Sequence, residues 1–465
     1  MSGTARSPLP MRAAAAAYRF RESLFALPAL LVLGSIALAE VATAVDRAAA
    51  ARALPLTLSM HSSTATWLLS TVAGATITTA GVVFSLTVVS LQLASSQFSP
   101  RVMRSFIRDR LSQVVIGLLV ATFVYAVLVL RAVDADSRAT APRISLTVAV
   151  LLTVVTVLLI VAHLDHLAHG LQVGRVVERI SAEGRQVLAA TDRTTAAERP
   201  AVVRTQPAGQ PALTVPAPCD GWVTQAPSDR LLLAVPPGTT VRLETRVGAY
   251  VHGGEPLVTV WPAPEDRGAT ARRLAATVLV SASRTMQYDV DFALRQLVDI
   301  GLRALSAAVN DPTTAVEAGL RIGSLLRRLL TADAPADAVA GPDRRVLLRP
   351  WQLSAEEYIA HGFDQLRHAA PAQPQVAAAL LRVLRMLIAH VQVAGRAEHV
   401  PALHRQIDLL LESLRTSGLH PADLARLEAV ATAADPADHS SHWDAAPAGA
   451  GAGGLNGSHA AAGTP

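Results

Sequence analysis

Three groups of polar side chains in this sequence have residue types and spacings that can support chemistry. The first group lies between residues 284 and 312: Arg284, Asp291, Arg295, Asn310, Asp311 and Pro312. Arginine and amide groups donate hydrogen bonds to phosphates and carboxylates, so Arg284, Arg295 and Asn310 can form an anion or nucleotide site. The favoured alternative is structural, because an acid four residues before an arginine stabilises an exposed helix face or a subunit contact.

The second group is a set of three histidines, His163, His166 and His169, at the end of an apolar run. On a helix they share about 120° of one face, so two of them can bridge a metal ion. This spacing is weak evidence, and hydrogen bonding at the membrane interface or between helices is favoured. The single Cys219 excludes a multi-cysteine metal site and an intrachain disulfide. No metal or other cofactor is predicted.

The third group is a seam of small and hydroxylated residues in the apolar segment 67–99. At about 100° per residue, they fall within roughly a third of the helix circumference. Its members are Ser70, Gly74, Thr78, Gly81, Ser85 and Gln92, continued by Ser95 and Ser99. Small residues four apart let helices approach closely, and this packing interpretation is favoured. The alternative is that Thr78, Ser85 and Gln92 line a polar path between subunits or spans, because an amide at this depth needs a partner or water.

The elements that carry these groups are predicted to be membrane helices. About half of the 465 residues are apolar and only 17% are charged. A span needs about 20 apolar residues to cross the hydrocarbon layer. Four such runs occur, at 24–45, 67–99, 114–130 and 144–162. The first run can also be a cleaved signal peptide, but a span is favoured because the run continues past the candidate cleavage site at Ala37-Leu38-Ala39.

Arginine residues predict the orientation of these spans. The N-terminal arm and the loop at 100–110 hold four arginines each, more than the other short loops. The positive-inside bias therefore predicts that both termini lie in the cytoplasm. The membrane that the protein is predicted to span is the plasma (inner) membrane. After Ser99-Pro100 a short helix sorts Arg101, Arg104 and Arg108 to one side, which is typical of an interfacial helix contacting lipid phosphates.

The chain beyond the spans is predicted to be cytoplasmic. Short β-type runs punctuated by Gly and Pro occupy 213–262, and VGAYVHGGEPLVTV (Val247 to Val260) is similar to a hairpin of barrel-sandwich hybrid domains. Carrier domains of that type are modified on a lysine, and this chain has none, so a structural or docking module remains. Amphipathic helices follow from 269, with Asp311 as an N-cap and Pro312 at the first helical position. The segment 331–349 reads as a surface loop.

The predicted fold is an α-helical integral membrane protein with a four-span transmembrane region, a small cytoplasmic β module and a cytoplasmic helical domain. Its parts are a basic cytoplasmic arm (1–22), a four-span transmembrane domain (23–168) with an interfacial helix (100–110), a juxtamembrane helix and linker (169–212), a small β domain (213–262), a helical cytoplasmic domain (269–434) and a disordered tail (435–465).

Several stretches of the chain resemble a known bacterial family. They are GVVFSLTVVSLQLASSQFSPRVMRSFIRDR, HLDHLAHGLQVGRVVERI, VGAYVHGGEPLVTVWP and RTMQYDVDFALRQLVDIGLRALSAAVNDPTTAV. The chain is identified by them as a member of the domain-of-unknown-function family numbered twenty-two fifty-four. The resemblance implies an integral membrane protein with a cytoplasmic C-terminal region, and it supplies no activity.

Two functions remain open on the sequence alone. One is an oligomeric channel or transport-related assembly that its cytoplasmic region gates, and the other is a non-conducting membrane scaffold or sensor whose cytoplasmic helices bind a protein partner. The predicted partners are the lipid bilayer, further copies of the chain and a cytoplasmic protein. Nucleic acid is not expected, since no basic patch interleaved with aromatic residues occurs. An enzyme is not expected either, because no P-loop, Gly-x-Gly-x-x-Gly, His-Glu-x-x-His or nucleophile elbow occurs.

Overall fold

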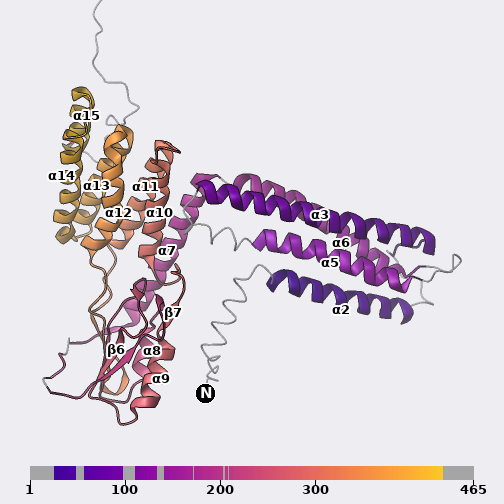
Figure 1. The fold of residues 1–465 in the computed structure, drawn as a ribbon, viewed down its shortest axis with the longest axis horizontal. Helices are drawn as coiled ribbons and strands as arrows, with labels where there is room; N and C mark the ends of the chain where they lie inside the picture. The colour runs from indigo at the N-terminus through magenta and orange to yellow at the C-terminus, as the bar shows by residue number, and fades with distance from the viewer. Residues whose placement is uncertain are drawn as a thin grey trace, which may run out of the picture. The chain divides into compact units, whose positions relative to one another are not determined.

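The computed structural model describes residues 26–48, 57–97, 110–133, 141–170, 172–202, 205–207 and 209–432 (Figure 1). The chain divides into two compact units. The first unit comprises Met1–Arg303 and Asp333–Gln352, and the second comprises Ala304–Ala332 and Leu353–Pro465. The predicted basic arm at 1–22, the tail at 435–465 and the interfacial arginines Arg101, Arg104 and Arg108 lie outside the described residues.

Four long apolar helices form a bundle in the first unit. They are α2 (Ala26–Ala48), α3 (Ser62–Gln97), α5 (Arg110–Ala132) and α6 (Arg143–Gly170). Helix α5 is the most enclosed of the four and packs against the other three, lying between α2 and α3 (Figure 1). Because all four are long and apolar enough to cross a bilayer, the chain is a helical membrane protein, as predicted.

Small residues and one carboxylate set the packing of this bundle. At Gly117 of α5, a Cβ atom would lie 2.7 Å from Leu31 and 2.8 Å from the Pro28 backbone of α2, so only glycine allows this approach. At the opposite end of α2, Asp46 accepts hydrogen bonds from the Ile144 and Ser145 backbone N–H groups at 2.9 and 2.8 Å. A carboxylate there caps the N-terminus of α6 and ties it to α2.

A β module follows the bundle in the first unit. A helix, α7 (Val173–Ala197), precedes it and lies within the segment predicted as a juxtamembrane helix and linker, 169–212. The six-stranded sheet has the order β1-β8-β9-β4-β6-β2 and the three-stranded sheet has the order β5-β3-β7. The strands are β1 (Arg199–Pro200), β2 (Leu213–Pro216), β3 (Gly221–Gln225), β4 (Thr240–Leu243), β5 (Tyr250–Val251), β6 (Pro256–Trp261), β7 (Leu279–Ser281), β8 (Ala338–Ala340) and β9 (Val346–Leu348).

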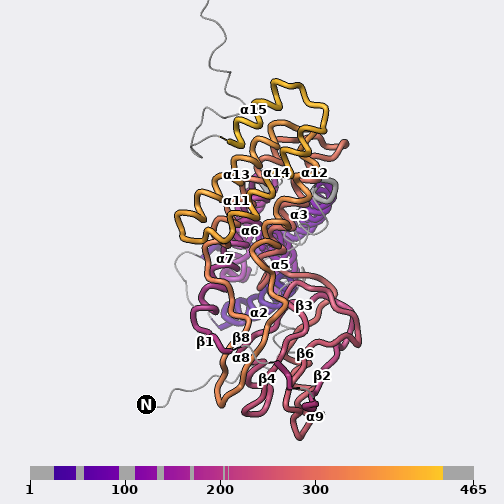
Figure 2. Tube along the Cα trace, turned by 90° about the vertical axis from the view of Figure 1, so that its left-hand side faces the viewer, coloured from indigo at the N-terminus to yellow at the C-terminus, as the bar shows by residue number. Residues whose placement is uncertain are grey.

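The segment similar to a hairpin, 247–260, contributes one strand to each sheet: β5 pairs with β3, whereas β6 pairs with β2 and β4. Gly248 has a φ of 85° and Gly254 a φ of 92°, values that favour glycine, so the backbone needs glycine at both positions. Val251 and Leu257 are buried in the core of the β module. Two short helices, α8 (Ser228–Leu233) and α9 (Arg267–Thr277), complete the module, and α9 packs on β2 (Figure 2).

The prediction of a surface loop at 331–349 is wrong. Strand β9 pairs in parallel with β4, and β8 pairs with β9, so this segment completes the larger sheet. Leu347 is fully buried in the core of the β module. Strands of three residues are too short to show a period-two pattern, and β4, the parallel partner of β9, lies about a hundred residues earlier, so the sequence pattern could not reveal them.

The second unit is a helical bundle. Its helices are α11 (Pro312–Leu329), α12 (Ala355–Ala369), α13 (Pro374–Val393), α14 (Val400–Arg415) and α15 (Pro421–Thr432). Helix α13 contacts the other four and is the core of this unit. It is also the fifth described helix that is long and apolar enough to cross a membrane by length and composition. Its apolar residues are buried against neighbouring helices, which accounts for a helix that is apolar on several sides.

Candidate functional site

The predicted seam of α3 lies on the outside of the single chain. All six of its residues are exposed: Ser70, Gly74, Thr78, Gly81, Ser85 and Gln92. The buried face of α3 is formed instead by apolar residues such as Leu69, Val72 and Val83. At about 100° per residue, the two faces are centred roughly 150° apart on the helix. The seam therefore does not pack against the chain's own described spans, which leave it accessible to another molecule.

The surroundings of the seam leave room for such a molecule. A Cβ atom added at Gly74 or Gly81 would meet no atom within 4 Å. The Thr78 hydroxyl donates to the Gly74 carbonyl of its own helix at 2.8 Å. Exposed apolar side chains, among them Val82 and Phe84, flank the seam on both sides. The outer surface of α3 thus combines apolar ridges, which suit lipid, with a polar stripe, which does not.

A second site, here called the Arg284 clamp, is built from the first polar group of the sequence. The Arg284 guanidinium donates to Asp289 through Nε at 2.6 Å and through Nη2 at 3.1 Å, and to Asp291 through Nη2 at 2.7 Å. It also lies over the rings of Trp222 and Phe292, at 5.5 and 5.2 Å from their centroids. The three charged side chains are almost completely buried, and two carboxylates surround one cation.

The clamp joins the β module to the start of α10 (Val290–Ala304). Gly248, just before β5, has a positive φ, and a Cβ atom there would overlap the Asp289 carboxylate. Asp289 also accepts the Phe292 backbone N–H at 3.2 Å. Burial alone lowers the pKa of a guanidinium, but the hydrogen bonds and charges of Asp289 and Asp291 outweigh burial and raise the pKa of Arg284. Arg284 therefore stays charged and holds protein carboxylates.

The remaining residues of the predicted anion site also contact protein groups. Arg295 lies 4.0 Å from Asp291 in the first unit, whereas Asn310 belongs to the second unit and accepts a hydrogen bond from the Gln373 amide at 3.0 Å. Asp311 caps α11, because its carboxylate accepts the Thr314 N–H at 3.1 Å. Pro312 is the first residue of that helix, as predicted.

The three histidines are not brought to one site in the part of the chain that the structure describes. His163 is fully buried in α6, whereas His166 is exposed, and the side chain of His169 lies outside the described residues. Among described residues no group of three His, Cys, Asp or Glu side chains is placed to hold a metal ion.

Sequence reasoning missed several partners in the first unit. Trp222 and Gly248 belong to the Arg284 clamp. The signal in the sequence that could have indicated them is a tryptophan in one β-type run and a glycine at a turn before the next. Glu198 and Arg349 form a second buried pair, with Arg349 Nη2 donating to Glu198 Oε2 at 2.7 Å and Nη1 to Oε1 at 3.1 Å. They are 151 residues apart, and no local spacing could indicate their contact.

These observations define a helical membrane protein with a β module and a helical bundle beyond its apolar helices. The chain matches the family described as predicted membrane protein (DUF2254) over residues 21–386, and it belongs to that family, as its sequence motifs predicted. Uncharacterized proteins of Mycobacterium bovis and Mycobacterium tuberculosis are each 35% identical to it over 321 residues, which cover 66% of this chain and 60% of each relative. The chain thus spans about three fifths of the length of these curated relatives. No solved structure matches it.

Proposed function

We propose that the protein has four spans, α2, α3, α5 and α6, in a plasma (inner) membrane, with both termini in the cytoplasm. The excess of arginine in the N-terminal arm and the 100–110 loop supports this orientation. The burial of α13 by its neighbours in the second unit supports a count of four spans, because a helix surrounded by protein has little surface to offer lipid.

The exposed thiol of Cys219, the single cysteine of the chain, allows a direct test of this orientation. A membrane-impermeant maleimide should label Cys219 only after the cells are permeabilised. As a matched control, Leu58→Cys in a Cys219→Ser background puts a thiol in the exposed connection before α3, and it should be labelled in intact cells. Labelling of Cys219 in intact cells would overturn the orientation.

The function we propose is an oligomeric membrane assembly in which seams of several copies surround a polar path. One observation carries this proposal: α3 turns its glycines, hydroxyls and Gln92 away from its own bundle. Polar groups in hydrocarbon are costly, and contact with a second copy or with water removes that cost. Conduction would then be gated by the cytoplasmic region that the spans carry.

Ion flux through proteoliposomes tests the path. The full chain should conduct, and Thr78→Val combined with Gln92→Leu should reduce the flux strongly, because the two changes remove polar groups from the seam at nearly constant size. Val82→Leu, an exposed apolar position beside the seam, is the matched control and should leave the flux unchanged. If the native protein does not conduct, the channel proposal fails.

The alternative is a non-conducting scaffold or sensor that binds a cytoplasmic protein through the helical bundle. Exposed apolar side chains on that bundle, Leu320 of α11 and Val393 of α13, favour this candidate. An absence of flux together with retained self-association through the seam would support it. We propose no enzymatic activity, since the sequence has no recognisable nucleophile, phosphate-loop or metalloprotease motif.

A further inference from the structure

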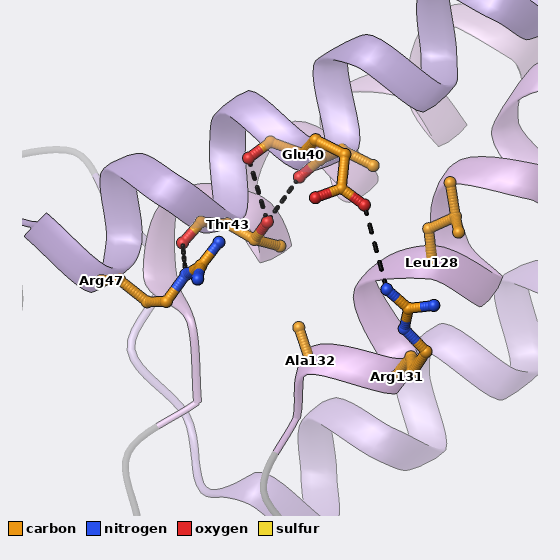
Figure 3. Close-up of a pocket in the computed structure, with 7 residues that line it drawn as sticks. Glu40, Thr43, Arg47, Leu128, Arg131 and Ala132 are labelled. Carbon is orange, nitrogen blue, oxygen red and sulfur yellow. Dashed lines mark hydrogen bonds and ion pairs between the residues drawn. The ribbon is translucent and has the colours of Figure 1, made fainter.

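A hollow of about 300 Å³ lies between the C-terminal ends of α2 and α5 (Figure 3). Glu40 and Arg47 reach it from α2, and Arg131 reaches it from α5. The Glu40 Oε1 and Arg131 Nη2 atoms are 4.0 Å apart, at the limit of an ion pair, and the two side chains are 59% and 80% exposed. The hollow therefore holds three charged groups that are only loosely satisfied by one another.

Small side chains create the hollow. Ala39 and Ala132 line it, and the Thr43 hydroxyl turns back to donate to the Ala39 and Glu40 carbonyls at 2.9 and 3.1 Å. At the other end of the same helix pair, Gly117 brings α5 into close contact with α2. The two helices thus touch closely at one end and leave space at the end that carries the charges.

The arginines of the hollow are the simpler part to explain. Arg47 and Arg131 occupy the last turns of α2 and α5, where a cation interacts favourably with the helix dipole. The Arg47 Nε donates to the Thr43 carbonyl at 3.3 Å, and its terminal nitrogens have no protein partner among the described residues. Those nitrogens and the Arg131 guanidinium are donors for a phosphate group.

Glu40 is not explained in this way. The helix dipole acts within the last turn of a helix, and Glu40 lies before that turn, so the dipole does not account for a charge there. Glu40 also lies eight residues before Ala48, about 12 Å from the helix end at 1.5 Å per residue, so it reaches the edge of the hydrocarbon layer. A carboxylate at that depth requires a cationic partner, and the long contact to Arg131 supplies only part of one.

We propose that the hollow binds a phosphoethanolamine headgroup, with the phosphate held by Arg47 and Arg131 and the ammonium held by Glu40. This group carries one anion and one cation, which match the two arginines and the carboxylate. Its source is a phospholipid of the surrounding bilayer, because Leu128 lines the hollow and α2 and α5 are apolar helices with lipid-accessible surfaces. Free phosphoethanolamine has the same chemistry and is distinguished by the test.

Lipid retention by the purified full chain, measured by native mass spectrometry, tests the proposal. Phosphatidylethanolamine, phosphatidylglycerol and phosphatidylcholine of identical acyl chains are offered separately, and soluble phosphoethanolamine is a fourth arm. Phosphatidylethanolamine should be retained best. Arg131→Gln should lower retention of both phosphatidylethanolamine and phosphatidylglycerol about tenfold, the effect of one lost charge-assisted hydrogen bond. Glu40→Gln should lower the retention of phosphatidylethanolamine and leave the retention of phosphatidylglycerol unchanged.

Arg143→Gln is the matched control, since Arg143 begins α6 at the same end of the bundle and does not line the hollow. It should leave all retention values unchanged. Glu40 and Arg131 are exposed, so their variants should remain folded, which a single symmetric peak in size-exclusion chromatography confirms. Equal retention of the three lipids, or a Glu40→Gln variant that keeps the native preference, would overturn the proposal. Binding of soluble phosphoethanolamine without lipid retention would keep the recognition chemistry and reject the lipid source.

Discussion

The Arg284 clamp shows how a motif that resembles a binding site can be a structural element. Arginine between two buried carboxylates satisfies both, and little of its hydrogen-bonding capacity is left for an external anion. A buried pair of this kind adds little net stability compared with an apolar core, but removing one member leaves uncompensated charge. The clamp is therefore best understood as a device that fixes α10 against the β module.

Replacing Arg284 by alanine should destabilise the first unit by about 3–5 kcal/mol, because two buried carboxylates lose their cation. Pulse proteolysis of the full chain in detergent measures the free energy of unfolding. Arg415→Ala is the control, since Arg415 forms an exposed pair with Glu428 at 2.8 Å, and its loss should cost about 0–1 kcal/mol. Equal losses in the two variants would contradict the structural role of Arg284.

Gly248→Ala tests separately the close contact between Gly248 and the Asp289 carboxylate of the clamp. The change adds a Cβ atom to a residue with a φ of 85° and pushes it into the Asp289 carboxylate. Gly238→Ala is matched to it, since Gly238 has a φ of 74° and open space around it, and should cost only the positive-φ strain of about 1–2 kcal/mol. Gly248→Ala should cost clearly more. The same loss at both positions would mean that the contact with Asp289 is unimportant.

Among the helices and strands, those with strong local signals could be predicted from sequence. The apolar runs gave the four long helices, and Asp311-Pro312 gave the start of α11. The face that α3 turns inward could not be predicted, because a seam of small residues fits an internal contact and an external contact equally well. The strands β8 and β9 could not be predicted either, since each has only three residues and joins the rest of the sheet through a strand far away in the sequence, β1 for β8 and β4 for β9.

Leu347→Ala tests whether β9 belongs to the core of the β module. Leu347 is fully buried there, so its truncation should lower the free energy of unfolding of the first unit by about 2–5 kcal/mol. Leu233→Ala, the same change at an exposed position of α8, should have an effect within about 0.5 kcal/mol. The comparison uses pulse proteolysis in detergent, and a neutral Leu347→Ala variant would contradict the position of β9 in the sheet.

The account of the whole molecule depends on the outer surface of α3. The described helices of the chain cover one face of α3, lipid suits its apolar ridges, and the seam is the face that we propose another copy covers. Local sequence patterns predicted the seam and its periodicity. They could not reveal what covers it, because the contacts that we propose there lie between separate copies of the chain.

Cysteine cross-linking in native membranes tests this claim most directly. In a Cys219→Ser background, Ser85→Cys and Leu86→Cys put thiols at neighbouring exposed positions about 100° apart on α3, inside and outside the seam. With a short bis-maleimide reagent, we predict cross-linked dimers for Ser85→Cys and almost none for Leu86→Cys. Cross-linking of Leu86→Cys to the same or a greater extent, or no cross-linking of Ser85→Cys, would contradict the account.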